Sequence, residues 1–118
     1  MKLYRGKITV IAQELVQRLI DEGDVEVDPT MKAEAEMDIQ SIMLSYLKQE
    51  RRLGDVVRDF IALNQIDYDR RGEIRREKAK ERNHPTGDRV MPYLAGHFNQ
   101  MIMNSPNFDE VYSLDTVI

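Results

Sequence analysis

The sequence predicts an all-α protein, a small helical bundle of about four to five helices with one long central helix. Apolar residues recur at the spacing of amphipathic helices over residues 7–22 and 29–53, and no Cys is present to form disulfides or bind zinc. A chain of 118 residues has the usual size of one domain. Within it we distinguish a helical core at 1–68, a charged basic helix and linker at 69–89, and a C-terminal apolar helical segment at 90–118.

The first predicted helix runs from about Lys7 to Glu22 and carries a wide apolar face. Its members are Ile8, Ile11, Ala12, Leu15, Val16, Leu19 and Ile20. Because one neighbour cannot cover such a face, we expect the helix to pack against two elements or against a second subunit. Gly23 then occupies the position of a left-handed C-cap, and residues 24–27 alternate as a short extended connector.

The long central helix is predicted to begin at Asp28 and Pro29, an N-cap followed by proline in the first turn. It is predicted to end near Leu53, because Gly54 is a common helix terminator. A third, shorter helix over 55–64 then follows.

Glu50 lies within the apolar stripe of the long helix. A carboxylate there either meets a cation or marks where the helix leaves the core, and buried acids are usually paired. We therefore expect an ion pair, with three arginines near in sequence: Arg51, Arg52 and Arg58. The two histidines, His84 and His97, lack the spacing of metal ligands, and we expect them on the surface.

The net charge of −4 is unevenly distributed. Residues 1–68 sum to −4, residues 69–89 to +3 and residues 90–118 to −3. The predicted helix at 69–82 holds seven candidate contacts for a partner or nucleic acid: Arg70, Arg71, Arg75, Arg76, Lys78, Lys80 and Arg82. Four acids alternate with them, and no aromatic residue lies in this helix for base stacking. A solvated, salt-bridged helix, a protein contact and a nucleic-acid contact all remain consistent with this pattern.

A break at 83–88 precedes a predicted fifth helix, and a last helical turn is expected within 107–114. Four residues of this part form a candidate apolar interface, with core packing as the alternative: Phe98, Met101, Ile102 and Tyr112. The apolar end of the chain, Thr116 to Ile118, suggests a segment completed by a partner.

Several segments together resemble a known family. Those in the first part are Met1–Ile8, Ile11–Val16, Leu19–Val27, Asp38–Ile42 and Tyr46–Arg51, and those in the last part are Asn99–Ile102 and Asp109–Tyr112. They are similar to a bacterial family of small helical proteins catalogued as domain of unknown function 507. The resemblance covers most of 1–68, is looser over 69–89 and returns over 94–114. It implies an all-helical bacterial cytoplasmic protein and assigns no residue a catalytic role.

No catalytic motif, phosphate-binding glycine loop or metal-ligand pattern is present, so we expect no catalytic, cofactor-binding or metal site. No apolar run is long enough to cross a bilayer and the N-terminus lacks the pattern of a signal peptide, which predicts a cytoplasmic protein. The sequence therefore favours a non-enzymatic helical interaction module that self-associates or binds a protein partner. The alternative is an RNA- or ribosome-associated protein that uses the basic helix at 70–82.

Overall fold

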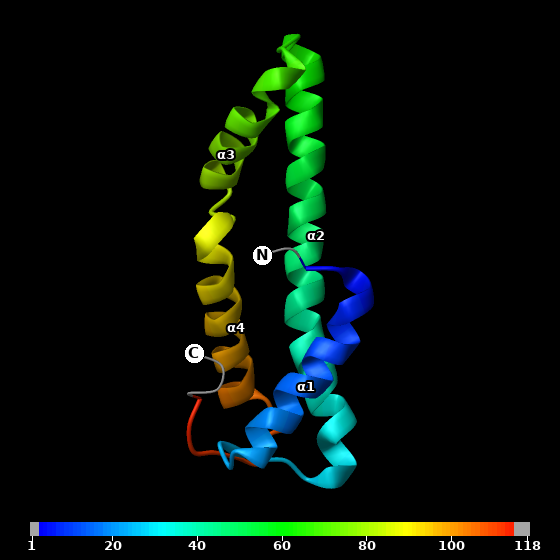
Figure 1. The fold of residues 1–118 in the computed structure, drawn as a ribbon, viewed down its shortest axis with the longest axis vertical. Helices are drawn as coiled ribbons and strands as arrows, with labels where there is room; N and C mark the ends of the chain where they lie inside the picture. Colours follow the sequence, from blue (N-terminus) through cyan, green and yellow to red (C-terminus); the bar gives the residue numbers. More distant parts are fainter. Residues whose placement is uncertain (1–2, 115–118) are drawn as a thin grey trace.

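The computed structural model describes residues 3–114 and shows the predicted all-α fold (Figure 1). The α-helices of this part are α1 (Ile8–Asp21), α2 (Lys32–Asn64), α3 (Arg71–Glu81) and α4 (Val90–Asn104). Short 3-10 turns are η1 (Arg5–Lys7), η2 (Pro29–Met31), η3 (Tyr68–Arg70) and η4 (Gly87–Arg89), and two short strands are β1 (Val25–Glu26) and β2 (Glu110–Val111). The molecule is elongated, about 55 Å long and 20–22 Å wide.

Helix α2 runs along the whole length of the molecule, with α3 and α4 returning beside it one after the other (Figure 1). Helix α1 packs across the first half of α2. We call residues 3–47 and 90–114 the body and residues 48–89 the arm. The body carries 4 basic and 11 acidic side chains, for a net charge of −7, whereas the arm carries 12 and 9, for a net charge of +3.

The predicted helix end at Gly54 is wrong, because α2 continues to Asn64. Gly54 keeps helical backbone geometry, so its cost is only the roughly 1 kcal/mol of low helix propensity. Leu53 and Val57 extend the buried stripe across this point, and their burial outweighs that cost. The helix ends instead at Asn64, followed by Gln65 as the C-cap with a left-handed φ of 52°.

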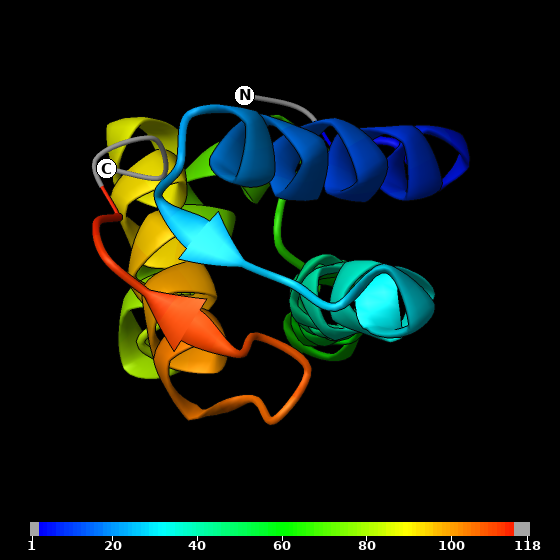
Figure 2. The same ribbon diagram turned by 90° about the horizontal axis from the view of Figure 1, so that it is seen from below.

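The expected connector at 24–27 pairs as a strand, and the expected last helical turn does not form. Strands β1 and β2 are antiparallel, with Val25 opposite Val111 and Glu26 opposite Glu110. The backbone N–H of Tyr112 adds a 2.7 Å hydrogen bond to the carbonyl of Asp24. These ladder bonds take the backbone groups that a helical turn would use. Figure 2 shows the two strands side by side at the end of the body.

The body holds the larger apolar core. Its main cluster joins all three helices of the body and both strand segments: Ile8, Ala12, Val16, Leu19, Val25, Ala35, Ile39, Met43, Ile102 and Phe108. The wide face of α1 is therefore covered within the same chain. The arm has a smaller cluster, formed by Leu53, Val57, Ile74 and Ala79. A third cluster of Tyr46, Val90 and Leu94 lies where α2 meets α4.

One residue of the candidate apolar interface, Ile102, lies in the core and is not available to a partner. Ile102 is only 1% exposed, and Phe98 is half-buried against the body clusters. Met101 is half-buried, and only Tyr112 is largely exposed, with its hydroxyl donating to Glu26 Oε1 at 3.0 Å. These apolar side chains close the body on itself. The end of the chain at Thr116–Ile118 lies outside the described residues.

Candidate functional site

The basic side chains of α3 do not form one surface. Ile74 and Ala79 are buried and define the side of α3 that faces α2. Helical spacing places Arg71, Arg75, Lys78 and Arg82 on that same side. The regular basic stripe of the sequence thus lies on the side of α3 that faces α2, with its first and last members, Arg71 and Arg82, still exposed. The other cations lie elsewhere: Arg76 and Lys80 on α3 and Arg70 in η3.

Contacts of this stripe hold α3 against α2. Arg75 Nη2 lies 2.8 Å from Glu50 Oε2, and Lys78 Nζ lies 4.0 Å from the centroid of the Phe60 ring. Arg71 stacks over the ring of a tyrosine in η3. Cations used in this way stabilise the arm through ion pairing and cation–π contact and are less available to a partner.

Glu50 joins three elements at the base of the arm. The expected ion pair is present, but its partners are Arg75 of α3 and His84 of the following loop, which come from distant parts of the chain. The His84 ring also stacks on Tyr46, with 5.3 Å between ring centroids. Burial raises the pKa of Tyr46 to about 12, and the nearby Glu50 carboxylate adds to the shift. Loss of solvent and a neighbouring negative charge both disfavour a tyrosinate there.

The prediction that His84 is a surface residue is wrong, since it is only 8% exposed. Helix α3 ends at Glu81 with Arg82 as its C-cap, and the His84 N–H then donates a 2.9 Å bond to the carbonyl of Ala79. Asn83 has a φ of 54° and turns the chain, so the loop carries His84 inward. His97 of α4 is exposed and packs its ring 4.4 Å from that of Tyr93.

A cleft of about 720 Å³ lies between α3, the loop after it, η4 and the start of α4; we call it the α3–α4 cleft. Arg76, Lys80 and Arg89 line it and are all exposed. No Asp or Glu is among its lining residues, and none of the three cations lies within 4.0 Å of a carboxylate of the described residues, although Arg76 interacts with Glu73 at longer range. Pro92 and Tyr93 of α4 also line the cleft, one turn after Arg89. Such a cleft attracts anions.

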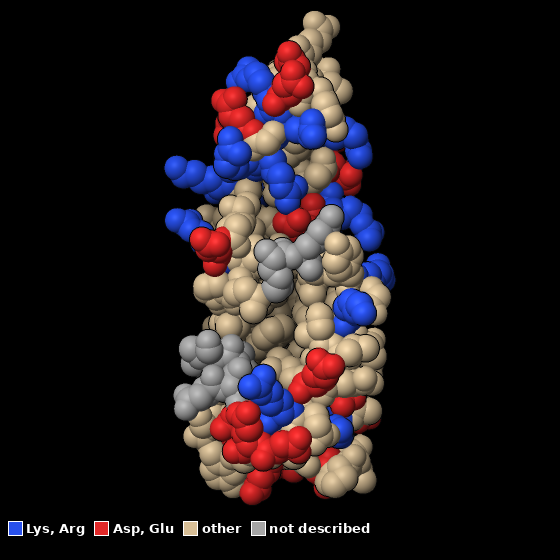
Figure 3. Space-filling view, viewed as in Figure 1, with Lys and Arg blue, Asp and Glu red and all other residues tan. Residues whose placement is uncertain are grey.

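A smaller cleft of about 420 Å³ adjoins the same histidine. Gln49, Arg52, Arg82 and His84 line it, again without a carboxylate. His84 thus forms part of both cavities, and five cations line the two. Figure 3 shows Lys and Arg gathered over the arm, with acids among them, whereas Asp and Glu gather at the opposite end of the body.

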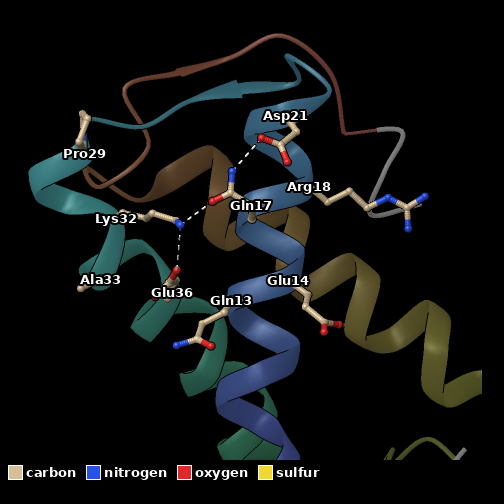
Figure 4. A pocket seen from close by; sticks show the side chains of 9 residues that line it. All are labelled: Gln13, Glu14, Gln17, Arg18, Asp21, Pro29, Lys32, Ala33 and Glu36. Carbon is tan, nitrogen blue, oxygen red and sulfur yellow. Dashed lines mark hydrogen bonds and ion pairs between the residues drawn. The ribbon is translucent and has the colours of Figure 1, made fainter.

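The groove between α1 and α2 is comparable in size, about 770 Å³, but its polar groups satisfy one another. Lys32 is hydrogen-bonded to Gln17 and lies 3.9 Å from Glu36, and Gln17 donates to Asp21 at 2.8 Å (Figure 4). Acids and bases alternate around it, so it offers no single charge to a ligand. The clefts beside His84 are therefore the better candidate site.

Sequence reasoning missed Arg89 and Tyr93 as site residues. Arg89 was counted in the basic segment but follows the helix, and Tyr93 lies in the apolar segment after it. The signal for the site was the sharp break at 83–88, which joins the end of α3 to the start of α4, the next helix beside α2. This fold brings an aromatic residue beside a helix that has none of its own.

The whole chain, residues 1–118, matches the model of a family described as "Protein of unknown function (DUF507)", and the protein belongs to that family. The resemblance of the separate segments is thereby confirmed. Neither the curated proteins nor the solved structures contain a match to this chain. Within residues 3–114, no helix has the length and apolar character to cross a membrane, and no group of three or more His, Asp or Glu could hold a metal ion.

Proposed function

We propose that this protein is a non-enzymatic RNA-associated protein of the bacterial cytoplasm, which contacts RNA phosphates with the basic end formed by the arm. The observation that carries this proposal is the α3–α4 cleft, whose three cations face no lining carboxylate. Cations without a protein partner can replace the counterions that surround a phosphate backbone, and this exchange supplies most of the affinity for nucleic acid.

The distribution of charge between the arm and the body also supports RNA contact through the arm. The arm carries +3 and the body −7, so a polyanion is attracted to one end and repelled from the other. Arginine provides four of the five cations around the two clefts, namely Arg52, Arg76, Arg82 and Arg89. The guanidinium group donates two parallel hydrogen bonds to a phosphate, which suits it to this role.

A protein partner bound through the C-terminal apolar residues is less well supported. Ile102 and Phe98 pack into the body, which leaves that proposal without its central contacts. The exposed cations of the clefts remain available, so we favour RNA over a protein partner.

Fluorescence anisotropy with a labelled single-stranded RNA tests the proposal. If both clefts contact phosphates, raising salt from about 50 to about 200 mM weakens binding on the order of a hundredfold. The triple variant Arg76→Gln, Lys80→Gln and Arg89→Gln lowers the slope of log affinity against log salt by about 2, since each single-strand phosphate contact contributes roughly 0.7.

A matched control removes three exposed cations from the body: Arg5→Gln, Lys7→Gln and Arg18→Gln. It makes the same change in net charge, and we expect it to leave the slope unchanged. Circular dichroism establishes that both variants stay helical. An affinity that does not depend on salt concentration, or that decreases equally in the two variants, would refute a role for the arm.

A further inference from the structure

We infer that the α3–α4 cleft holds one nucleoside 5′-phosphate unit, with the phosphate on Arg76, Lys80 and Arg89 and the base against Pro92 and Tyr93. This inference rests on the proposed function and specifies the unit of RNA that the cleft takes. The same chemistry is offered by a strand and by a free mononucleotide, and the experiment below separates them.

The lining of the cleft holds both kinds of group that a nucleotide requires. Arg76 and Lys80 lie one helical turn apart on α3, and Arg89 follows from η4. Helix α4 adds a proline and an aromatic residue, Pro92 and Tyr93, one turn after its N-cap Arg89. The cleft therefore offers cations for a phosphate beside an aromatic ring for the flat face of a base.

Tyr93 is held in place before any ligand binds. It is half-buried, and its hydroxyl lies 3.4 Å from Gln49 Oε1 of α2. Its ring packs against His97 at 4.4 Å and approaches Tyr46 at 6.2 Å. A ring fixed by three neighbours loses little entropy when a base stacks on it, which favours binding.

The carboxylate that contacts His84 of the cleft lining is already paired within the protein. Both oxygens of Glu50 are engaged, Oε2 by Arg75 and Oε1 by His84. His84 itself forms part of the cleft wall, between the carboxylate and the cavity. The volume of about 720 Å³ is also within the usual range of small-ligand sites, roughly 300–1,000 Å³.

Titration of the full-length protein by NMR, with ¹⁵N-labelled backbone and observed tyrosine ring protons, tests the inference. The probes are adenosine 5′-monophosphate, ribose 5-phosphate, adenosine and inorganic phosphate. We expect the nucleotide to shift resonances of α3, 83–89 and Tyr93 and to bind on the order of tenfold more tightly than ribose 5-phosphate. Equal affinity for these two probes, or shifts that lie outside the cleft, would overturn the inference that a base packs against Pro92 and Tyr93.

Two variants divide the site into its parts. The double variant Arg76→Gln, Lys80→Gln should weaken binding of the nucleotide and of ribose 5-phosphate alike. Tyr93→Leu should weaken binding of the nucleotide only. Tyr93→Phe keeps the aromatic ring and should retain the preference for the nucleotide over ribose 5-phosphate. Should Tyr93→Leu fail to fold, the ligand series on the unaltered protein still decides the question.

The two proposals can fail separately. Salt-dependent RNA binding without any effect of mononucleotides on the cleft would overturn this inference and leave the proposed function standing. Binding of the mononucleotide without binding of RNA would support the cleft as a nucleotide site and refute the role in RNA association.

Discussion

The body and the arm of this protein are stabilised by different forces. The body buries ten residues in one apolar cluster, whereas the arm buries only four: Leu53, Val57, Ile74 and Ala79. The arm compensates with polar contacts at its base, chiefly those of Glu50 with Arg75 and His84. Because few apolar residues are needed to pack the arm, a larger share of its surface can carry charged side chains. The region with the weaker core is thus the region best suited to bind a polyanion.

The comparison first predicts that core truncations differ between the two regions. Ile39→Ala removes a fully buried side chain from the body and should lower the free energy of unfolding by about 2–5 kcal/mol. Ile74→Ala in the arm should cost less, because its cluster is smaller and α3 can open locally. Denaturation with urea measures both. Equal losses would remove the distinction between body and arm.

The second prediction concerns the ion pairs at the base of the arm. Glu50→Gln leaves Arg75 and His84 without their carboxylate and should cost about 1–3 kcal/mol, less than a fully buried pair because Glu50 is partly exposed. Hydrogen exchange should accelerate in α3 and not in α1. The control Glu34→Gln alters an exposed acid of α2 and should change neither quantity. Faster exchange throughout the body would contradict a local role.

The extent to which the sequence predicts this fold depends on the range of the forces involved. The C-cap at Gly23 was predicted correctly, with a φ of 75°, because it is encoded by neighbouring residues. Gly54 was misread because its helix is continued by the burial of Leu53 and Val57, which depends on α3. The pairing of Val25 with Val111 joins residues far apart in sequence, and neither segment alone signals it.

How much of the candidate site the sequence predicts also depends on whether the contacts are local or long-range. The basic segment was recognised, but the direction of each cation depends on which side of α3 packs against α2. Arg75 was predicted as a contact for a partner and instead binds Glu50. Tyr93 reaches the cleft because the loop after α3 sets the first turn of α4 next to the end of α3, so no spacing within the basic segment could reveal it.

The third prediction, a small gain in stability, tests whether α2 is continuous through Gly54. Gly54→Ala should stabilise the protein by roughly 0.5–1 kcal/mol, since alanine favours helix and its Cβ would meet no atom within 4 Å. Gly23→Ala should instead destabilise it, because that position has a positive φ. Thermal unfolding measures both changes. A loss of stability in Gly54→Ala would indicate that α2 bends or breaks at this residue.

The smallest effect is expected for the exposed ion pair on the outer side of α3. The hydrogen bond from Arg70, together with its charge, lowers the pKa of Glu73. The pair therefore contributes above the ordinary carboxyl pKa, and its contribution is lost as the pH falls through the acid range. Glu73→Gln should leave the unfolding midpoint at neutral pH nearly unchanged, because surface pairs contribute little. A clear drop in the midpoint would show that the arm depends on its surface charges.

The most direct test of the central claim is to cross-link the full-length protein to single-stranded RNA with ultraviolet light and to locate the adducts by mass spectrometry. We predict adducts on peptides that span residues 76–93, which contain the cations and Tyr93 of the α3–α4 cleft. Their yield should fall as salt is raised. Adducts confined to α1 or to the strands of the body, or an absence of adducts at low salt, would contradict the claim that the arm binds RNA.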